Sequence, residues 1–232
     1  MHAEPSMAEI GAMIGSPARA AILSVLFDGR AMTATELAQI ANVSPATGSE
    51  HLGKLVQSGL LSCARHGRHR YYRLASAQVA EILEPLVHLV SAGPVPMRTV
   101  SPRARALREA RLCYDHLAGR LGVAICSAFL DRNILTPMDR DFALTQIGEA
   151  FFTDLGIDMS GVRLKRRMFA KQCLDWSERE PHLAGALGAA FTSHAFAQSW
   201  IRRTKHRRII TVTTRGREVF AQRLGITIDY VP

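Results

Sequence analysis

Residues Thr33–Leu61 constrain this chain more than any other stretch, because they carry the start, turn and stop signals of two consecutive short helices. Apolar residues recur at helical spacing in the first helix, and Asn42 follows as a turn residue. Ser44 and Pro45 then supply an N-cap and a first-turn proline, and Gly59 ends the second helix. This pattern predicts a helix-turn-helix.

The second helix is expected to present short or polar side chains outward, as a helix that enters a DNA major groove does. These side chains are Ala46, Thr47, Ser49, Glu50, His51 and Lys54. Two alternating segments around Gly67 predict a β-hairpin, the basic wing of a winged helix, with Arg65, Arg68, Arg70 and Arg73. The alternative interpretations are a helical corner of a core and a winged helix that binds protein.

Residues 1–92 resemble the ArsR/SmtB family of winged-helix repressors. SerProAlaThrGlySerGluHisLeu, at 44–52, matches the opening of that family's recognition helix, and LysLeuValGlnSerGlyLeuLeu, at 54–61, matches its close. The resemblance implies dimerisation through helices near 8–15 and 76–90. It also implies DNA contacts by Ser44, Thr47, Ser49 and His51 in the helix and by Arg68 and Arg70 in the wing.

Other features depart from that family. Gly48 stands where an apolar residue is usual, and a mid-helix glycine is expected to loosen the helix by about 1 kcal/mol relative to alanine. The stretch 36–40 lacks the cysteines of the arsenic-type members. The helix after the wing offers only Glu81, Glu84 and His88 as metal ligands, a set more typical of a solvated face.

The 232 residues are about twice what this domain needs, so a second domain is expected. A proline-interrupted connector at 93–104 separates it from the winged helix. The predicted fold class is mainly α with small β-hairpins: a winged helix-turn-helix at 1–92 and a helical domain of two similar repeats at 105–232.

The second domain contains an internal duplication, with copies at about 105–158 and 163–227. CysTyrAsp and HisLeuAlaGly in the first copy recur as CysLeuAsp and HisLeuAlaGly in the second, and both copies continue with Thr-x-x-Gly. Each copy is predicted as a long helix containing HisLeuAlaGly, a hairpin and a closing helix with the threonine as N-cap. Small residues on the long helices would let two helices approach closely.

The duplicated cysteines and histidines have three open interpretations. If they lie on one helix, Cys113 and His116 share a face, and Cys173 and His182 are their counterparts. Two thiols and two imidazoles would suit tetrahedral zinc or another soft metal, although their spacing matches no common zinc pattern. The alternatives are core packing and a pocket for a small-molecule or thiol-reactive effector.

Such an effector pocket would also contain the residues beside the duplicated cysteines, Tyr114, Asp115, Asp175 and Trp176. The aromatic rings would either stack on a flat effector or belong to the core. Cys63 and Cys126 are interpreted as packing residues, and no structural disulfide is predicted, as suits a reducing cytoplasm.

The net charge of +9 lies wholly in the second half, since residues 1–97 contain equal numbers of basic and acidic residues. The predicted recognition unit is nevertheless locally basic. Basic runs at 163–167 and 202–208 would contact phosphate, bind an anionic effector or form solvated hairpin tips.

No catalytic motif, resident cofactor, secretory signal or membrane span is predicted. The sequence therefore favours a cytoplasmic, homodimeric repressor that binds a double-stranded DNA operator and is released by an effector in its second domain. The alternatives are a thiol- or metal-dependent enzyme fused to a DNA-binding module, and a DNA-binding protein without an effector.

Overall fold

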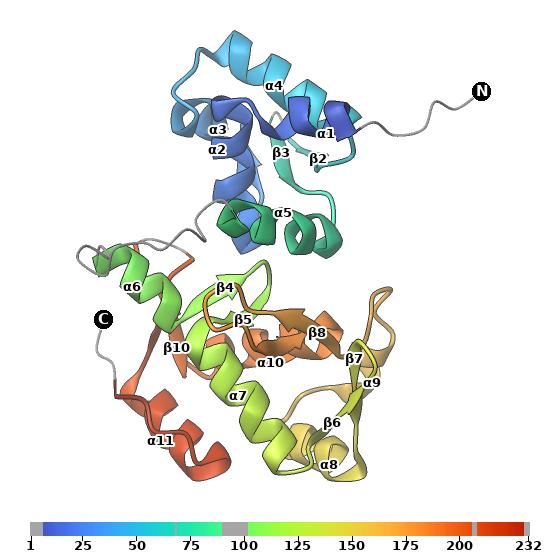
Figure 1. Ribbon diagram of the computed structural model, residues 1–232, viewed down its shortest axis with the longest axis vertical. Helices are drawn as coiled ribbons and strands as arrows, with labels where there is room; N and C mark the ends of the chain where they lie inside the picture. The colour runs from blue at the N-terminus through green and yellow to red at the C-terminus, as the bar shows by residue number, and fades with distance from the viewer. Residues whose placement is uncertain (1–6, 68, 90–101, 206–207, 230–232) are drawn as a thin grey trace. The chain divides into compact units, whose positions relative to one another are not determined.

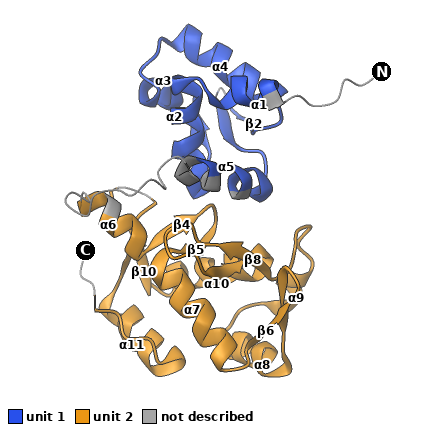
Figure 2. Ribbon diagram, in the orientation of Figure 1, with its two compact units in different colours: residues 1–89 blue, residues 90–232 orange. Residues whose placement is uncertain are grey.

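The computed structural model describes residues 7–67, 69–89, 102–205 and 208–229. The chain divides into two compact units, residues 1–89 and 90–232 (Figure 2). The predicted connector at 93–104 lies for the most part outside the described residues.

Unit 1 is a winged helix-turn-helix, which confirms that part of the predicted fold class. Its three-stranded sheet has the order β1-β3-β2. Strands β2 and β3, which are labelled in Figure 1, are antiparallel. Its elements are α1 (Met7–Ile14), α2 (Pro17–Val25), a 3-10 turn η1 (Leu26–Asp28), β1 (Met32–Thr33), α3 (Ala34–Ile40), α4 (Pro45–Gln57), β2 (Leu61–His66), β3 (His69–Leu74) and α5 (Ala77–Leu89).

Local signals define the two central helices. Thr33 begins α3 with a capping box, in which its hydroxyl accepts from the Glu36 N–H while the Glu36 carboxylate accepts from the Thr33 N–H. Ser44 caps α4 by accepting from the Thr47 N–H at 3.2 Å. Asn42 in the turn has a φ of 53°, a left-handed conformation that asparagine tolerates better than most residues.

Unit 2 contains small antiparallel sheets and helices in alternation. Its elements are α6 (Pro102–Glu109), β4 (Arg111–Cys113), β5 (His116–Ala118), α7 (Gly119–Asp131), β6 (Leu135–Met138), β7 (Asp141–Leu144), α8 (Gln146–Asp154), α9 (Met159–Arg163), β8 (Lys171–Leu174), β9 (Pro181–Ala184), α10 (Gly185–Ala197), β10 (Ile201–Arg203), β11 (Ile210–Val212) and α11 (Thr214–Leu224). The order hairpin, helix, hairpin, helix therefore occurs twice, and we interpret it as the duplication seen in the sequence.

The predicted long helix through HisLeuAlaGly is wrong. In both copies HisLeuAla is a strand, β5 or β9, and the helix begins at the following glycine. Gly119 and Gly185 have φ values of 74° and 78°, a left-handed conformation that separates strand from helix. A Cβ on Gly119 would also lie 2.5 Å from the carbonyl oxygen of Arg108. Each copy is thus hairpin-helix-hairpin-helix.

The prediction that small residues let two helices approach each other closely is also wrong, because these residues contact strands instead. A Cβ on Gly122 would lie 2.5 Å from the carbonyl oxygen of Leu117 and 3.7 Å from the Cβ of His182. The equivalent Gly188 faces Leu183 and the Cβ of His116 in the same way. Each helix therefore packs on its own preceding strand and on the histidine of the other copy.

The two copies exchange strand contacts. Strand β7 of the first copy pairs with β8 of the second in a four-stranded sheet of order β6-β7-β8-β9. The Phe142 N–H donates to the Ala170 carbonyl at 2.9 Å, and the Ile210 N–H donates to the Ala110 carbonyl at the same distance. Both copies contribute side chains to one hydrophobic core. This core contains edge-to-face aromatic contacts among Phe129, Phe152, Phe191, Trp200 and Phe220.

Among the described residues, no single helix is long and apolar enough to cross a membrane. The segments 8–14 and 17–28 pass that test only together, with a bend of 75° between them.

Candidate nucleic-acid interface and cysteine-histidine cluster

Helix α4 exposes most of the side chains predicted to contact DNA. Its exposed face is formed by Ser44, Ala46, Thr47, Ser49, Glu50 and Lys54. Leu52 and Leu55 are fully buried beneath this face. Because the exposed side chains at the start of the helix are small, the helix backbone itself can approach a ligand closely.

Gly48 is the one buried residue near the start of α4. A Cβ there would lie 2.7 Å from the Cβ of Ala38, so the glycine allows α3 and α4 to cross closely. The expectation that Gly48 only loosens the helix is therefore incomplete, because this residue also sets how α4 packs on α3.

Hydrogen bonds fix several of the exposed side chains. The hydroxyls of Ser44 and Thr47 lie 2.9 Å apart, and the Ser49 hydroxyl donates to the Pro45 carbonyl at 2.9 Å. Lys54 forms an ion pair with Glu50 at 2.6 Å, one helical turn away. This ion pair lowers the pKa of Glu50.

Arg19 is a residue that the sequence analysis missed. Its guanidinium lies 3.2 Å from Nδ1 of His51 and donates to the Met13 carbonyl at 2.7 Å. His51 is half-buried, unlike the exposed residues of the predicted contact face on α4. No local pattern could indicate this contact, because it joins two helices that are distant in the sequence.

The wing carries exposed basic side chains. Arg65 and Arg70 are paired across β2 and β3, near the Gly67 turn, and both are exposed. The predicted wing contact Arg68 lies outside the described residues, as do the side chains of Glu81, Glu84 and His88 on α5.

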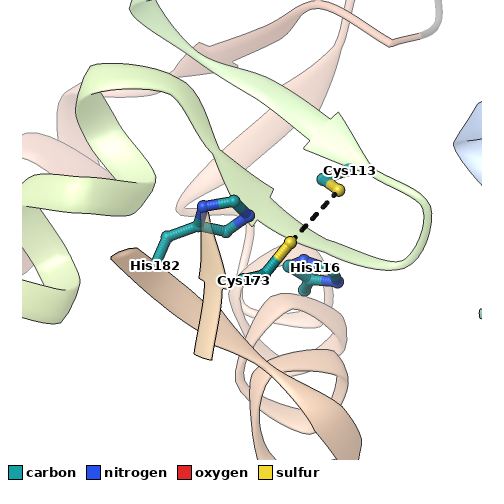
Figure 3. Close-up of side chains that lie close together, drawn as sticks. All are labelled: Cys113, His116, Cys173 and His182. Carbon is teal, nitrogen blue, oxygen red and sulfur yellow. Dashed lines mark hydrogen bonds between the residues drawn. The ribbon is translucent and has the colours of Figure 1, made fainter. Parts of the chain in front are cut away.

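Unit 2 brings together the duplicated cysteines and histidines. The prediction that Cys113 and His116 lie on a helix is wrong, because they face each other across the β4-β5 hairpin. Cys173 and His182 face each other in the same way across β8 and β9. One ligand atom from each of the four lies within 4.8 Å of those of the other three (Figure 3). The two Sγ atoms are 3.9 Å apart.

Both histidines of this cluster are buried, with exposed fractions of 0% for His116 and 1% for His182. Among the described residues, Nε2 of each ring and Nδ1 of His182 have no hydrogen-bond partner. The rings stack on each other with centroids 5.1 Å apart. Cys113 is buried and Cys173 is half-buried.

Two carboxylates flank the imidazoles. Asp115 lies 3.4 Å from Nδ1 of His116, and Asp175 lies 3.6 Å from Nδ1 of His182. Each carboxylate also forms an ion pair with an arginine from the other copy. Asp115 pairs with Arg167, and Asp175 pairs with Arg111 at 2.9 Å.

The electrostatics of the flanking carboxylates and the histidines differ. Burial would raise the pKa of both aspartates, but hydrogen bonds and arginine charges outweigh it and lower the pKa values. Burial would lower the pKa of His116, but Cys113 and Asp115 raise it to about 9. The pKa of His182 is held well below its usual value by burial and by the charges of His116 and Arg111, despite the opposing charge of Asp175.

Two of the remaining predicted pocket residues, Tyr114 and Trp176, have distinct local environments. Tyr114 occupies the β4-β5 turn with a φ of 58°. The Trp176 ring is covered by the Arg111 guanidinium, 4.6 Å from its centroid. A cavity of about 380 Å³ lies elsewhere, between α7 and residues 226–229.

The two other cysteines stand apart from the cluster. Cys63 is exposed on the wing, and Cys126 is buried within α7, where burial raises the pKa of its thiol to about 12. Cys126 is therefore an inert thiol at neutral pH.

Comparison with known proteins decides the family. Residues 14–64 match a family model described as a helix-turn-helix domain. The HTH-type transcriptional regulator YdfF of Bacillus subtilis is 42% identical over 224 residues, which cover 97% of this chain and 99% of YdfF. The chain belongs to the helix-turn-helix transcriptional regulators. Because the match to YdfF extends over both units, the regulator and YdfF share unit 2 as well.

Two solved structures are each similar to 37% of the regulator. NolR of Sinorhizobium fredii is 30% identical and covers 37% of the regulator and 85% of NolR, with a TM-score of 0.33. The transcriptional repressor BigR of Xylella fastidiosa is 27% identical over 37% of the regulator and 87% of BigR, also with a TM-score of 0.33.

Proposed function

We propose that this regulator is a repressor of ArsR type that binds a double-stranded DNA operator as a homodimer. Helix α4 would lie in the major groove, and the β2-β3 wing would contact the phosphate backbone. The observation that carries this proposal is the exposed, small and polar face of α4, held by the Ser44 cap and flanked by the exposed Arg65 and Arg70.

Exposed apolar side chains on α1 and α5 support the homodimer. Ile10 on α1 is 46% exposed, and Ile82 and Leu86, one turn apart on α5, are 57% and 38% exposed. These two helices are also the ones that the ArsR/SmtB resemblance assigns to the dimer interface. A dimer would place two copies of α4 on half-sites about one turn of DNA apart.

The proposed role of unit 2 is to sense an effector, a soft metal or a thiol-reactive species, at its cysteine-histidine cluster. Effector binding would shift the population of dimers toward a spacing of the two α4 helices that no longer fits both half-sites. The half-buried Cys173, 3.9 Å from Cys113, supports this role because a reagent can reach it.

DNA binding is tested by selecting duplexes from a randomised pool with the full chain, then measuring affinity for the selected sequence over a range of salt concentrations. Thr47→Glu should weaken binding about tenfold or more, because it adds a negative charge to the groove-facing surface. Gln57→Glu, at the far end of the same helix, is the matched control. Absence of any preferred sequence, together with a steep salt dependence, would favour the DNA-binding protein without an effector.

Sensing is tested separately on the selected duplex. Affinity is measured with metal-free protein after addition of Zn²⁺, of hydrogen peroxide, or of neither, for the regulator and for its Cys173→Ser variant. We expect one of the two reagents to lower the affinity of the regulator for the duplex and to leave the affinity of the Cys173→Ser variant unchanged. Equal affinity in every arm would remove the sensing role and leave the DNA-binding proposal intact.

A further inference from the structure

We propose that Cys113, His116, Cys173 and His182 bind one Zn²⁺ ion, which joins the first hairpins of the two halves of unit 2. This inference does not rest on the proposed DNA binding, because all four residues and their neighbours belong to unit 2. It assigns a tetrahedral site with two thiolate and two imidazole ligands.

The four ligand atoms are already spaced as such a site requires. With Zn–S distances near 2.3 Å, tetrahedral geometry separates two sulfur atoms by about 3.8 Å. The Sγ atoms of Cys113 and Cys173 are 3.9 Å apart. All pairwise separations among the four ligand atoms are within 4.8 Å, so small side-chain shifts would complete the coordination.

The buried imidazoles supply an independent argument. Nε2 of His116 and of His182 has no hydrogen-bond partner in the part of the chain that the structure describes, and each histidine is at most 1% exposed. Leaving such a nitrogen unsatisfied costs about 1–3 kcal/mol. A metal ion that accepts the lone pair of each Nε2 removes this cost, whereas neither a disulfide nor apolar packing would.

The flanking carboxylates match the outer shell of a metal site. Asp115 lies 3.4 Å from Nδ1 of His116, within hydrogen-bond distance, and leaves Nε2 of that ring for the metal. Asp175 lies 3.6 Å from Nδ1 of His182, just beyond hydrogen-bond distance, so that a small shift would orient the second ring in the same way. Metal-binding histidines are commonly oriented in this way. This arrangement gives a reason for the repeated Cys-x-Asp pattern in the sequence.

The donor set favours zinc and a closed site. Two thiolates neutralise a divalent cation, which removes the penalty of burying an uncompensated charge. Tetrahedral sulfur and nitrogen coordination is typical of zinc, and four protein ligands leave no open position for a substrate. The site therefore stabilises or switches unit 2 and does not catalyse a reaction. A cysteine-histidine pair from each hairpin also explains why the hairpins are held together.

Metal analysis of the full chain tests this inference. The protein, purified without added chelator under reducing conditions, should contain about one equivalent of zinc, or take up one equivalent when Zn²⁺ is added to metal-free protein. With Co²⁺ in place of zinc, thiolate-to-cobalt charge-transfer bands and the intense visible bands of tetrahedral cobalt should appear. Absence of stoichiometric uptake, or octahedral cobalt without thiolate bands, would overturn the site.

Variants assign the ligands. Cys173→Ser should lose the cobalt charge-transfer intensity of one thiolate and bind zinc at least tenfold more weakly, whereas the matched control Cys63→Ser, on the wing, should keep both properties. Asp115→Asn should retain the tetrahedral spectrum but bind zinc about 10-fold to 100-fold more weakly. If the Cys173→Ser variant binds zinc as tightly as the native chain, or if the native thiols form a Cys113–Cys173 disulfide under the same reducing conditions, the inference fails.

Discussion

Gly48 determines how closely the two helices of the helix-turn-helix can cross. A Cβ at this position would lie 2.7 Å from the Cβ of Ala38, too close for two carbon atoms without a shift of one helix. Gly53 lies on the same helix, and a Cβ there would meet no other element of the described chain within 4 Å. Alanine substitutions at these two glycines therefore distinguish an effect on helix packing from an effect on helix propensity.

Gly48→Ala should destabilise the helix-turn-helix by about 1–2 kcal/mol, because overpacking outweighs the gain in helix propensity. Hydrogen exchange of the backbone amides in α3 and α4 measures this free energy of opening. Gly53→Ala is the control and should slow exchange, since only propensity changes. If Gly48→Ala slowed exchange equally, the close crossing would not be a constraint.

Asp175 is a second residue whose environment can be tested. Its carboxylate is fully buried, pairs with Arg111 at 2.9 Å and accepts the Gly119 N–H at 2.6 Å. Asp175→Asn should lower the free energy of unfolding of unit 2 by about 3–5 kcal/mol, because the Arg111 charge loses its partner.

Urea unfolding followed by tryptophan fluorescence measures this loss, since both tryptophans, Trp176 and Trp200, belong to unit 2. Asp154→Asn removes the same charge from an exposed pair with Arg223 and should change the free energy of unfolding by about 1 kcal/mol or less. Equal effects of the two substitutions would contradict the importance of burial.

At the scale of elements, the wing gives the clearest prediction for DNA binding. Arg70→Ala should weaken binding to all duplexes by a similar factor and reduce the slope of log affinity against log salt by about one, the signature of one lost phosphate contact. Arg140→Ala removes an exposed charge from unit 2 and serves as control. If Arg70→Ala instead reduced the preference for the selected sequence and left the salt dependence unchanged, Arg70 would contact base edges and not phosphate.

The elements of unit 1 could be predicted because their signals are local. The Thr33 and Ser44 caps, Pro45 and Gly59 mark the ends of α3 and α4 within a few residues of each boundary. In unit 2 the strands β5 and β9 escaped prediction. Each is only three or four residues long, and each adjoins a helix whose apolar spacing extends naturally over it. Their strand conformation depends on partners across a hairpin and on the left-handed Gly119 and Gly185.

The donor set of the candidate metal site could be predicted, but its geometry could not. The duplication in the sequence identified all four cysteine and histidine residues. The predicted structure, however, had Cys113 and His116 on a helix instead of across a hairpin. Only the pairing of β4 with β5 and of β8 with β9 puts each cysteine opposite a histidine. The flanking Arg111 and Arg167 are too distant in sequence from their aspartate partners for any pattern to connect them.

At the scale of the whole molecule, the proposed dimer depends on exposed apolar side chains of α5. Ile82→Glu should shift the regulator from dimer to monomer, because a charge cannot be buried at the interface without a large cost. Light scattering coupled to size-exclusion chromatography measures the mass. Ile147→Glu, at a site that is 58% exposed compared with 57% for Ile82, is the control and should leave the mass unchanged. A monomeric native chain would refute the interface.

The exchange of strand contacts in unit 2 has a consequence during protein synthesis. Strand β7 pairs with β8 on one edge, and Leu112 of β4 and the adjoining Ala110 form backbone hydrogen bonds with residues 208 and 210. While these later residues are still inside the ribosome, the earlier strands expose open edges, which tend to join edges of other nascent chains. The strand edges of unit 2 therefore stay open during synthesis until residues 208–210 have left the ribosome.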